Sequence, residues 1–276
     1  MGHPFDPGPV EEPFASLVRD YPGEDVYPLE DFRTEWGPIF HRGRLDGSAR
    51  VLILGQDPAA SETVARRILV GEAGRRVQGL LAKLGIDRSY VMFNTFLYSV
   101  FGQGGGSRHK KDPKIAEYRN RWLEALLAPG KVEAVIGLGE LADLAWQQWI
   151  ETPAGKKDTP AFKHVSHPTR PESSSKGDAA KKAEATKTML AEWNVALEEL
   201  RPHVKHPDAD RPFEPYGDDF EESERPPIPE EDMPPGLPEW MRSPKAWASR
   251  EGETPDAKRR TLVAKVPSSV PLPKID

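Results

Sequence analysis

Three polar residues follow short apolar runs in the sequence and have side chains suited to chemistry on a bound ligand. Asp57 follows VLILGQ, and its carboxylate can orient a water molecule or stabilise a developing cation. Asn94 ends YVMFN, and its amide can donate and accept at once, as reading one edge of a base requires. His167 precedes a proline and can donate to a departing oxyanion. Each residue type alone is more often a turn former or a structural group.

The predicted strands and helices place these three residues at the same edge of a sheet. Apolar runs predict strands over 51–55, 90–94, 132–139 and 161–167, and helical periodicity predicts helices over 73–85, 113–128, 139–150 and 176–200. This alternation predicts a three-layer α/β/α sandwich with a short, mostly parallel four-stranded central sheet. Ligands bind beyond the carboxyl ends of such strands, where Asp57, Asn94 and His167 all fall.

Composition divides the chain into three parts. The apolar runs lie within residues 36–204, which we predict to be the folded α/β domain, after an extension over residues 1–35. Of the 29 prolines, 15 lie in residues 201–276, among acidic residues and few periodic apolar positions. We expect residues 205–276 to be an extended tail or one draped on the domain, without a core of its own and without catalytic groups.

Several classes of site are excluded by composition. The chain has no cysteine, which excludes disulfides, thiolate zinc sites, cysteine-ligated iron–sulfur clusters and a cysteine nucleophile. We expect no metal, because HVSH (164–167) is isolated. No apolar stretch reaches the length of a bilayer, and MGHPFDPGPVEEP lacks the basic and apolar regions of a secretory signal, so we expect a cytoplasmic protein.

Charge gives a weaker indication. The net charge of -6 argues weakly against a nucleic-acid partner. Two short basic clusters, RHKK (108–111) and GKK (155–157), fit either a local phosphate-binding edge or ordinary solvated loops. Composition alone therefore leaves the partner open.

The two loop motifs, with the asparagine between them, resemble the uracil-DNA glycosylase superfamily. Its Gly-Gln-Asp-Pro loop is matched by residues 55–58, its His-Pro-Ser/Thr turn by residues 167–169, and its strand ending in Asn by Asn94. VGEAGRRVQGLLAKLGI (70–86) also looks like the Val-Gly-Arg-Ala-Gly segment and following helix of the bacterial branches. The resemblance covers residues 36 to about 200 and, without cysteines, points to a divergent bacterial-type branch that lacks the iron–sulfur cluster.

The resemblance implies a monomeric, cofactor-free enzyme of base excision repair that flips uracil out of single- or double-stranded DNA and hydrolyses its N-glycosidic bond. Asp57 would position the attacking water and stabilise the cationic sugar. His167 and a backbone amide near Gln56 would stabilise charge on uracil O2. Asn94 would accept from N3–H and donate to O4, which excludes cytosine by hydrogen-bond polarity.

The remaining site residues follow from the same resemblance. The expected base pocket consists of Gly55, Gln56, Pro58, Ala59, Leu69, Phe93 and Asn94. The expected DNA contacts are Arg108, His109, Lys110, Ser166, Pro168, Thr169 and Arg170. Within this second set, Arg170 is the candidate for the wedge that enters the DNA.

Two positions depart from the family pattern. The most selective branch has Tyr and His after the proline of the first motif, and that Tyr blocks the methyl group of thymine. Ala59 and Ala60 stand there in this chain, so we expect uracil to be preferred but 5-substituted or other deaminated bases to be admitted. Leu69 aligns with the stacking aromatic of the bacterial branches, which makes Phe93 the candidate for stacking.

Three alternatives remain open at this point. One relative becomes covalently trapped on the abasic site it makes, and its basic loop ends in a histidine at a place comparable to His109 in SRHKKDP (107–113). That relative lacks the aspartate of the first motif, so a phosphate-contacting loop is the favoured interpretation. The second alternative is a Rossmann-like hydrolase of nucleosides or nucleotides. GLGELA (137–142) lacks the Gly-x-Gly-x-x-Gly spacing that would support it. A non-catalytic or product-trapping binder of uracil-containing or abasic DNA is the third alternative.

Overall fold

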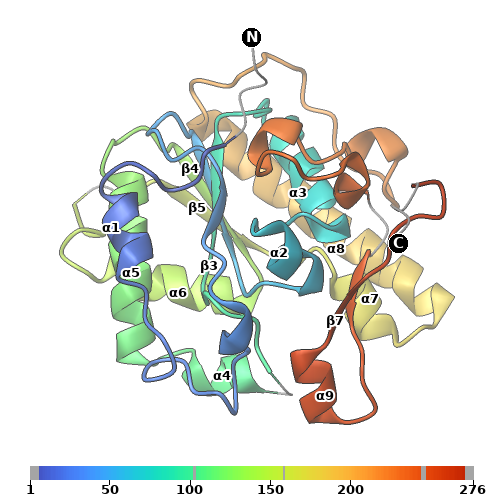
Figure 1. The fold of residues 1–276 in the computed structure, drawn as a ribbon. Helices are drawn as coiled ribbons and strands as arrows, with labels where there is room; N and C mark the ends of the chain where they lie inside the picture. Colours follow the sequence, from blue (N-terminus) through green and yellow to red (C-terminus); the bar gives the residue numbers. More distant parts are fainter. Residues whose placement is uncertain (1–5, 102–103, 158, 244–246, 271–276) are drawn as a thin grey trace.

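A mostly parallel sheet forms the centre of the protein (Figure 1). The computed structural model describes residues 6–101, 104–157, 159–243 and 247–270. The strands of the central sheet, in the order β1-β3-β2-β4-β5, are β1 (His41–Gly43), β2 (Val51–Gly55), β3 (Tyr90–Asn94), β4 (Ala134–Leu138) and β5 (Ala161–Val165). The predicted α/β class and its four parallel strands are confirmed. Antiparallel β1 makes a fifth strand, and its three residues are too few to produce a sequence pattern.

Helices cover both faces of the sheet, as Figure 1 shows. The α-helices of the central layers are α1 (Phe14–Arg19), α2 (Ala60–Ala65), α3 (Glu72–Lys83), α4 (Gly105–His109), α5 (Pro113–Leu127), α6 (Glu140–Ile150), α7 (Arg170–Ser175) and α8 (Ala179–Leu200). Successive strand residues point to opposite faces. Leu52 and Leu54 therefore pack in a core with α1, α5 and α6, while Val51 and Ile53 pack with α3 and α8. None of the helices in the described ranges has the length and apolar composition to cross a bilayer.

The carboxyl ends of the four parallel strands meet at one edge of the sheet. Gly55, the last residue of β2, pairs in register with Asn94, the last residue of β3. Leu138, the last residue of β4, pairs with Val165, the last residue of β5. The loops that follow these strands therefore begin side by side, which is what a shared ligand site requires.

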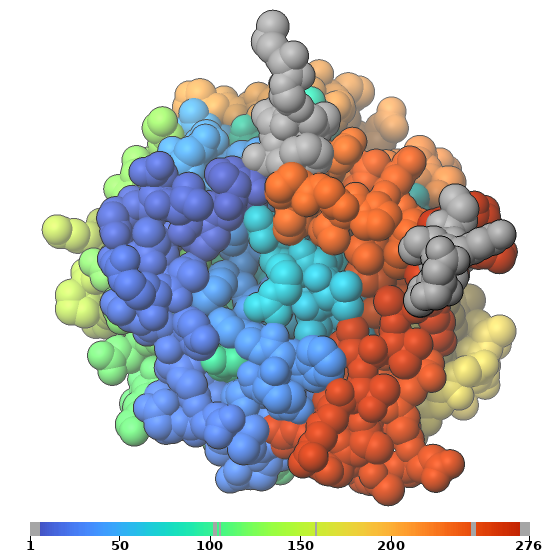
Figure 2. All heavy atoms as spheres, viewed as in Figure 1, coloured from blue at the N-terminus to red at the C-terminus, as the bar shows by residue number. Residues whose placement is uncertain are grey.

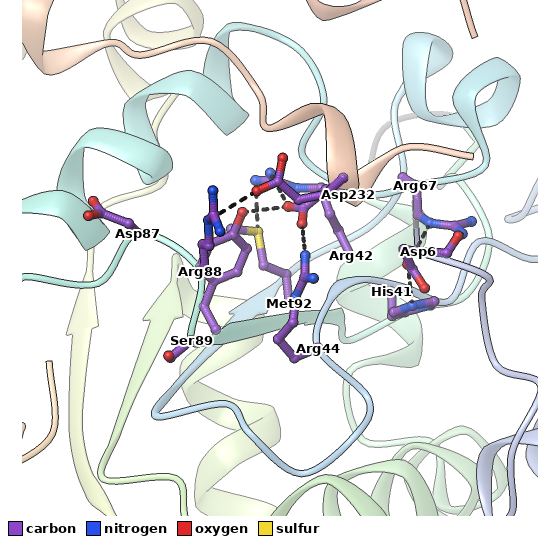
Figure 3. Close-up of polar contacts among 12 residues, drawn as sticks. Asp6, His41, Arg42, Arg44, Arg67, Asp87, Arg88, Ser89, Met92 and Asp232 are labelled. Atoms are coloured by element: carbon purple, nitrogen blue, oxygen red, sulfur yellow. Dashed lines mark hydrogen bonds and ion pairs between the residues drawn. The ribbon is translucent and has the colours of Figure 1, made fainter. Parts of the chain in front are cut away.

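The C-terminal segment packs onto the domain. In Figure 2 its orange and red atoms lie against the blue and cyan surface of the first 80 residues. The carboxylate of Asp232 is fully buried and pairs with Arg42 at 3.0 Å and with Arg44 (Figure 3). It also accepts a hydrogen bond from the hydroxyl of Tyr90. Met233 and Trp247 bury their side chains in an apolar cluster with residues of α2 and the loop that follows. The segment is held by a buried ion-pair network and by apolar burial together.

The elements of this segment form a small unit near the end of the chain. They are the hairpin strands β6 (Ala248–Arg250) and β7 (Leu262–Ala264), with helix α9 (Pro255–Arg260) between them. Short 3-10 turns, η1 at Thr34–Trp36 in the first part of the chain and η2 to η5 at Arg201–His203, Glu222–Glu224, Glu230–Asp232 and Glu239–Arg242, complete the fold.

Candidate active site

A cavity of about 1190 Å³ lies at the carboxyl edge of the sheet. The ends of the four parallel strands and the loops that follow them line it, with Asp57, Asn94 and His167 among the lining residues. The structure thus brings together the three residues that sequence chemistry singled out. The cavity exceeds the roughly 300–1,000 Å³ typical of small-molecule sites, which leaves room for a ligand with an extended appendage.

Asp57 is the second residue after β2. It is half-buried and lines the cavity, and protein surrounds its carboxylate. Its Oδ2 accepts a hydrogen bond from the backbone N–H of Val100 at 2.9 Å. Burial raises the pKa of Asp57 to about 6, against the opposing effects of that hydrogen bond and of the charges on Arg33 and Arg250. The carboxylate is therefore mostly ionised at neutral pH, and its pKa is close enough to 7 for it to accept and release a proton there, as an acid–base group must.

Glu62, which sequence reasoning missed, places a second buried carboxylate in the same cavity. Its two oxygens accept from the backbone N–H groups of Ala59 at 3.0 Å and Leu69 at 2.8 Å. Burial raises the pKa of Glu62 to about 7, and the charge on Asp57 acts in the same direction. A signal was available: Glu62 is the third residue of α2, where a glutamate often returns to the N–H of the residue before the helix.

His167 presents a neutral imidazole to the cavity. Burial lowers the pKa of His167 to about 4, so the ring is uncharged at neutral pH. Its Nδ1 accepts from the backbone N–H of Thr169 at 3.3 Å, and the Thr169 hydroxyl lies 3.0 Å from the same nitrogen. Because Nδ1 acts as the acceptor, the remaining ring proton is on Nε2. A neutral ring that donates from Nε2 can stabilise an oxyanion as it develops.

The side-chain amide nitrogen of Asn94 has no hydrogen-bond partner among the described residues. The residue is 3% exposed, and this nitrogen, Nδ2, is buried. Gly55 makes room for it, because a Cβ there would lie 2.3 Å from the Asn94 Oδ1. An unpaired buried N–H is costly, and a ligand carbonyl would satisfy it.

Gly139 packs between two other cavity residues and was also missed from the sequence. Gln56 donates from Nε2 to the carbonyl of Leu138 at 3.2 Å. A Cβ on Gly139 would lie 2.2 Å from that Nε2 and 3.4 Å from the Cβ of His167. Its φ of +85° is also a conformation that favours glycine. Gly139 therefore lets the loops after β2, β4 and β5 approach closely.

The apolar wall of the cavity differs from the one expected. Pro58, Ala59 and Leu69 line it, as expected, and Leu141 and Leu144 of α6 complete its apolar surface. The expectation that Phe93 stacks on the ligand is wrong. Strand neighbours point to opposite faces, so Phe93 enters the core, where it stacks on Trp122 with ring centroids 5.2 Å apart.

The residues expected to contact DNA divide into two groups. Those that line the cavity are Lys110, Ser166, Thr169 and Arg170. Those outside the lining are Arg108, His109 and Pro168. His109 binds Asp31 through Nε2 at 2.7 Å, and Arg108 pairs with the same carboxylate while its side chain stays 57% exposed. The carbonyl of Pro168 accepts from Arg76.

Arg33 and Arg250 also line the cavity, although the sequence did not single them out. Arg250 belongs to β6, so the C-terminal segment, which we expected to supply no catalytic group, contributes a side chain to the lining of the cavity. A single arginine after a proline-rich segment has no local signature, and only the tertiary fold brings it to Asp57. Within the described chain, no three histidine, aspartate or glutamate side chains are grouped to hold a metal ion.

Comparison with known proteins places both loop motifs within one family match. Residues 42–203 match the family model described as the Uracil DNA glycosylase superfamily. That range contains Asp57, Asn94 and His167. No curated protein matches the chain at a significant level.

Proposed function

Because the chain belongs to the uracil DNA glycosylase superfamily, with the match over residues 42–203, we propose that it hydrolyses the N-glycosidic bond of uracil in DNA. Membership itself implies a glycosylase-type activity on a DNA substrate. The observation that carries the finer proposal is the meeting of three groups in one cavity: the Asp57 carboxylate, the unpaired Asn94 amide and the neutral His167 ring.

The proposed reaction begins with a deoxyuridine flipped out of the DNA into the cavity. As the C1′–N1 bond breaks, its electron pair leaves with uracil, and the sugar becomes cationic. The Asp57 carboxylate stabilises that cation and orients the water that attacks C1′, whose proton it accepts. The His167 Nε2–H donates to uracil O2, where negative charge gathers. The uracil anion takes a proton from solvent and Asp57 returns its proton to solvent, so the products are free uracil and an abasic deoxyribose in an intact strand.

Base selection in this proposal depends on polarity at one wall and on space at another. The free Nδ2–H of Asn94 suits O4 of uracil, and its Oδ1 suits N3–H, whereas cytosine presents the opposite pattern. Ala59 leaves more room near the base than an aromatic ring would. A methyl group in an apolar pocket changes discrimination by only about 1–3 kcal/mol, so 5-substituted uracils fit the proposal.

A release assay over a panel of bases tests the function. The panel contains single uracil, thymine, hypoxanthine, xanthine and cytosine residues in single- and double-stranded oligonucleotides. We expect free uracil from the wild type, little or none from His167→Ala, and wild-type release from Asp218→Asn, whose aspartate is 79% exposed. Binding without release would support a non-catalytic binder instead. Hydrolysis of free deoxyuridine with intact oligonucleotides would support a nucleoside hydrolase.

A further inference from the structure

Two arginines from distant parts of the chain stand together on the cavity wall. Arg33 follows the short bridge between Phe32 and Val100, and Arg250 ends β6 in the C-terminal segment. Both line the cavity that contains Asp57. Burial lowers the pKa of Arg250 to about 10, and the positive charge of Arg33 adds to this effect. Holding two cations together in a partly desolvated place is unfavourable without an anion.

The carboxylates of Asp57 and Glu35 are near enough for their charges to act on both arginines, but no carboxylate of the described residues forms a direct ion pair with either one. Among the described residues, no carboxylate oxygen lies within 4.0 Å of either guanidinium, whereas neighbouring Arg259 pairs with Glu35 at 2.9 Å. Arg250 donates to the hydroxyl of Thr63 at 3.3 Å, and its Nη1 has no partner within the described chain. Arg33 donates to the carbonyl of Val100, and its Nε is likewise without a partner there. Each guanidinium therefore keeps at least one buried N–H without a partner among the described residues.

The fold fixes Arg250 from both sides. Before it, Trp247 is 3% exposed and packs in the apolar cluster with Val70. After it, Arg259 of α9 is buried and donates to Glu35 and to the carbonyl of Phe32, next to Arg33 in the chain. Figure 2 shows this red segment against the blue N-terminal part of the chain. These contacts on both sides hold the backbone of Arg250 in place, so that its charged side chain lies at the cavity.

We propose that Arg33 and Arg250 form an anion site that binds a backbone phosphate of DNA beside the flipped-out nucleotide. The proposal rests on the function proposed above, because Asp57 would act on the sugar, and the phosphates on either side of that sugar are the nearest anions of the substrate. The planar fork of a guanidinium matches phosphate oxygens with two donors at once. A free nucleotide would present the same phosphate chemistry, so the test must separate these two sources.

Salt dependence of binding gives the first test. Affinity for a single-stranded oligonucleotide with one deoxyuridine is measured by fluorescence anisotropy over a range of salt concentrations. Each phosphate contact contributes about 0.7 to the slope of log affinity against log salt for single strands. We expect Arg33→Gln and Arg250→Gln each to lower the slope by up to about that amount. Arg250→Lys, which keeps the charge, should retain the slope, as should the control Arg260→Gln, whose side chain is 73% exposed. Unchanged slopes in both glutamine variants would overturn the site.

Neutral linkages then identify the phosphate. A methylphosphonate replaces the phosphate on the 5′ or the 3′ side of the deoxyuridine. If the phosphate that Arg250 contacts has been replaced, the wild type and Arg250→Gln should bind the oligonucleotide with equal affinity. If the other phosphate has been replaced, Arg250→Gln should bind more weakly than the wild type. Equal, additive losses at both linkages would contradict a contact with either phosphate. Calorimetry with deoxyuridine monophosphate tests whether the site binds a free nucleotide. If this nucleotide binds the wild type but not Arg250→Gln, and the salt slopes for DNA binding are unchanged, the site belongs to a free nucleotide and the DNA assignment is overturned.

The binding readout separates this inference from the proposed function. Lowered slopes without any base release would support the anion site and contradict the glycosylase. Base release with unchanged slopes would support the glycosylase and contradict the anion site.

Discussion

Replacing Asp57 by asparagine should remove activity and, at the same time, stabilise the fold in a pH-dependent way. Burial raises the pKa of this carboxyl from 3.8 to about 6 in the folded protein. Because the folded-state pKa is the higher one, stability from this group is greatest below pH 3.8 and is lost as the pH rises through about 6. Above that pH, ionisation of Asp57 costs the folded state about 3 kcal/mol.

The Asp57→Asn variant has no such ionisation, while its amide oxygen can still accept from the Val100 N–H. We therefore expect its free energy of unfolding to exceed that of the wild type by about 3 kcal/mol at pH 8 and by roughly half of that amount at pH 5. Urea unfolding of both proteins at the two pH values measures this difference. Asp218→Asn, on the surface, should show no comparable gain.

The gain in stability must also be smaller at the lower pH. Two results would refute this account, in which the ionised Asp57 destabilises the fold. One is an equal difference in free energy of unfolding at pH 5 and pH 8, and the other is a variant less stable than the wild type at pH 8. A stable Asp57→Asn protein that releases uracil as fast as the wild type would refute the catalytic assignment independently.

Further perturbations test other parts of the account. Uracil release by the wild type should fall about tenfold from pH 7 to pH 5 as Asp57 is protonated, and a flat profile of kcat/KM would contradict this. Gly139→Ala should lower stability by about 1–3 kcal/mol, because it forces a positive φ and a clash with Gln56, and should slow release; wild-type unfolding and rates would argue otherwise. Asp232→Asn leaves buried Arg42 and partly exposed Arg44 without their carboxylate and should cost about 3–5 kcal/mol in thermal unfolding, whereas an unchanged Tm would show that the C-terminal segment is not part of the fold. Ala59→Tyr should restrict release to uracil in the base panel, and an unchanged set of bases would exclude this position as the gate.

The fold could be predicted because its core elements are long enough to carry a pattern. Each parallel strand has five residues, and the buried faces alternate along it between the two helical layers. The three central residues of the candidate site could be predicted for the same reason, since Asp57 and His167 closely follow such strands and Asn94 ends one. Position at a sheet edge is a property that local sequence already contains.

The missed residues depend on contacts that local sequence does not contain. Arg250 reaches the cavity only because Asp232 and Trp247 anchor the segment before it to the domain. Gly139 matters because two other loops approach it, which no spacing in GLGELA indicates. Phe93 was misassigned because its partner in the core, Trp122, lies on another element. In each case tertiary packing decides the role of the side chain.

The most direct test of the central claim is single-turnover release of base from a DNA strand with one deoxyuridine. Free uracil and the abasic site are both quantified, in the wild type and in Asp57→Asn with its fold verified by urea unfolding. We predict one uracil and one abasic site for each strand with the wild type, and a rate lower by orders of magnitude with Asp57→Asn. An intact strand after prolonged incubation with the wild type, or equal rates in the two proteins, would contradict the claim that this cavity is the active site of a uracil-DNA glycosylase.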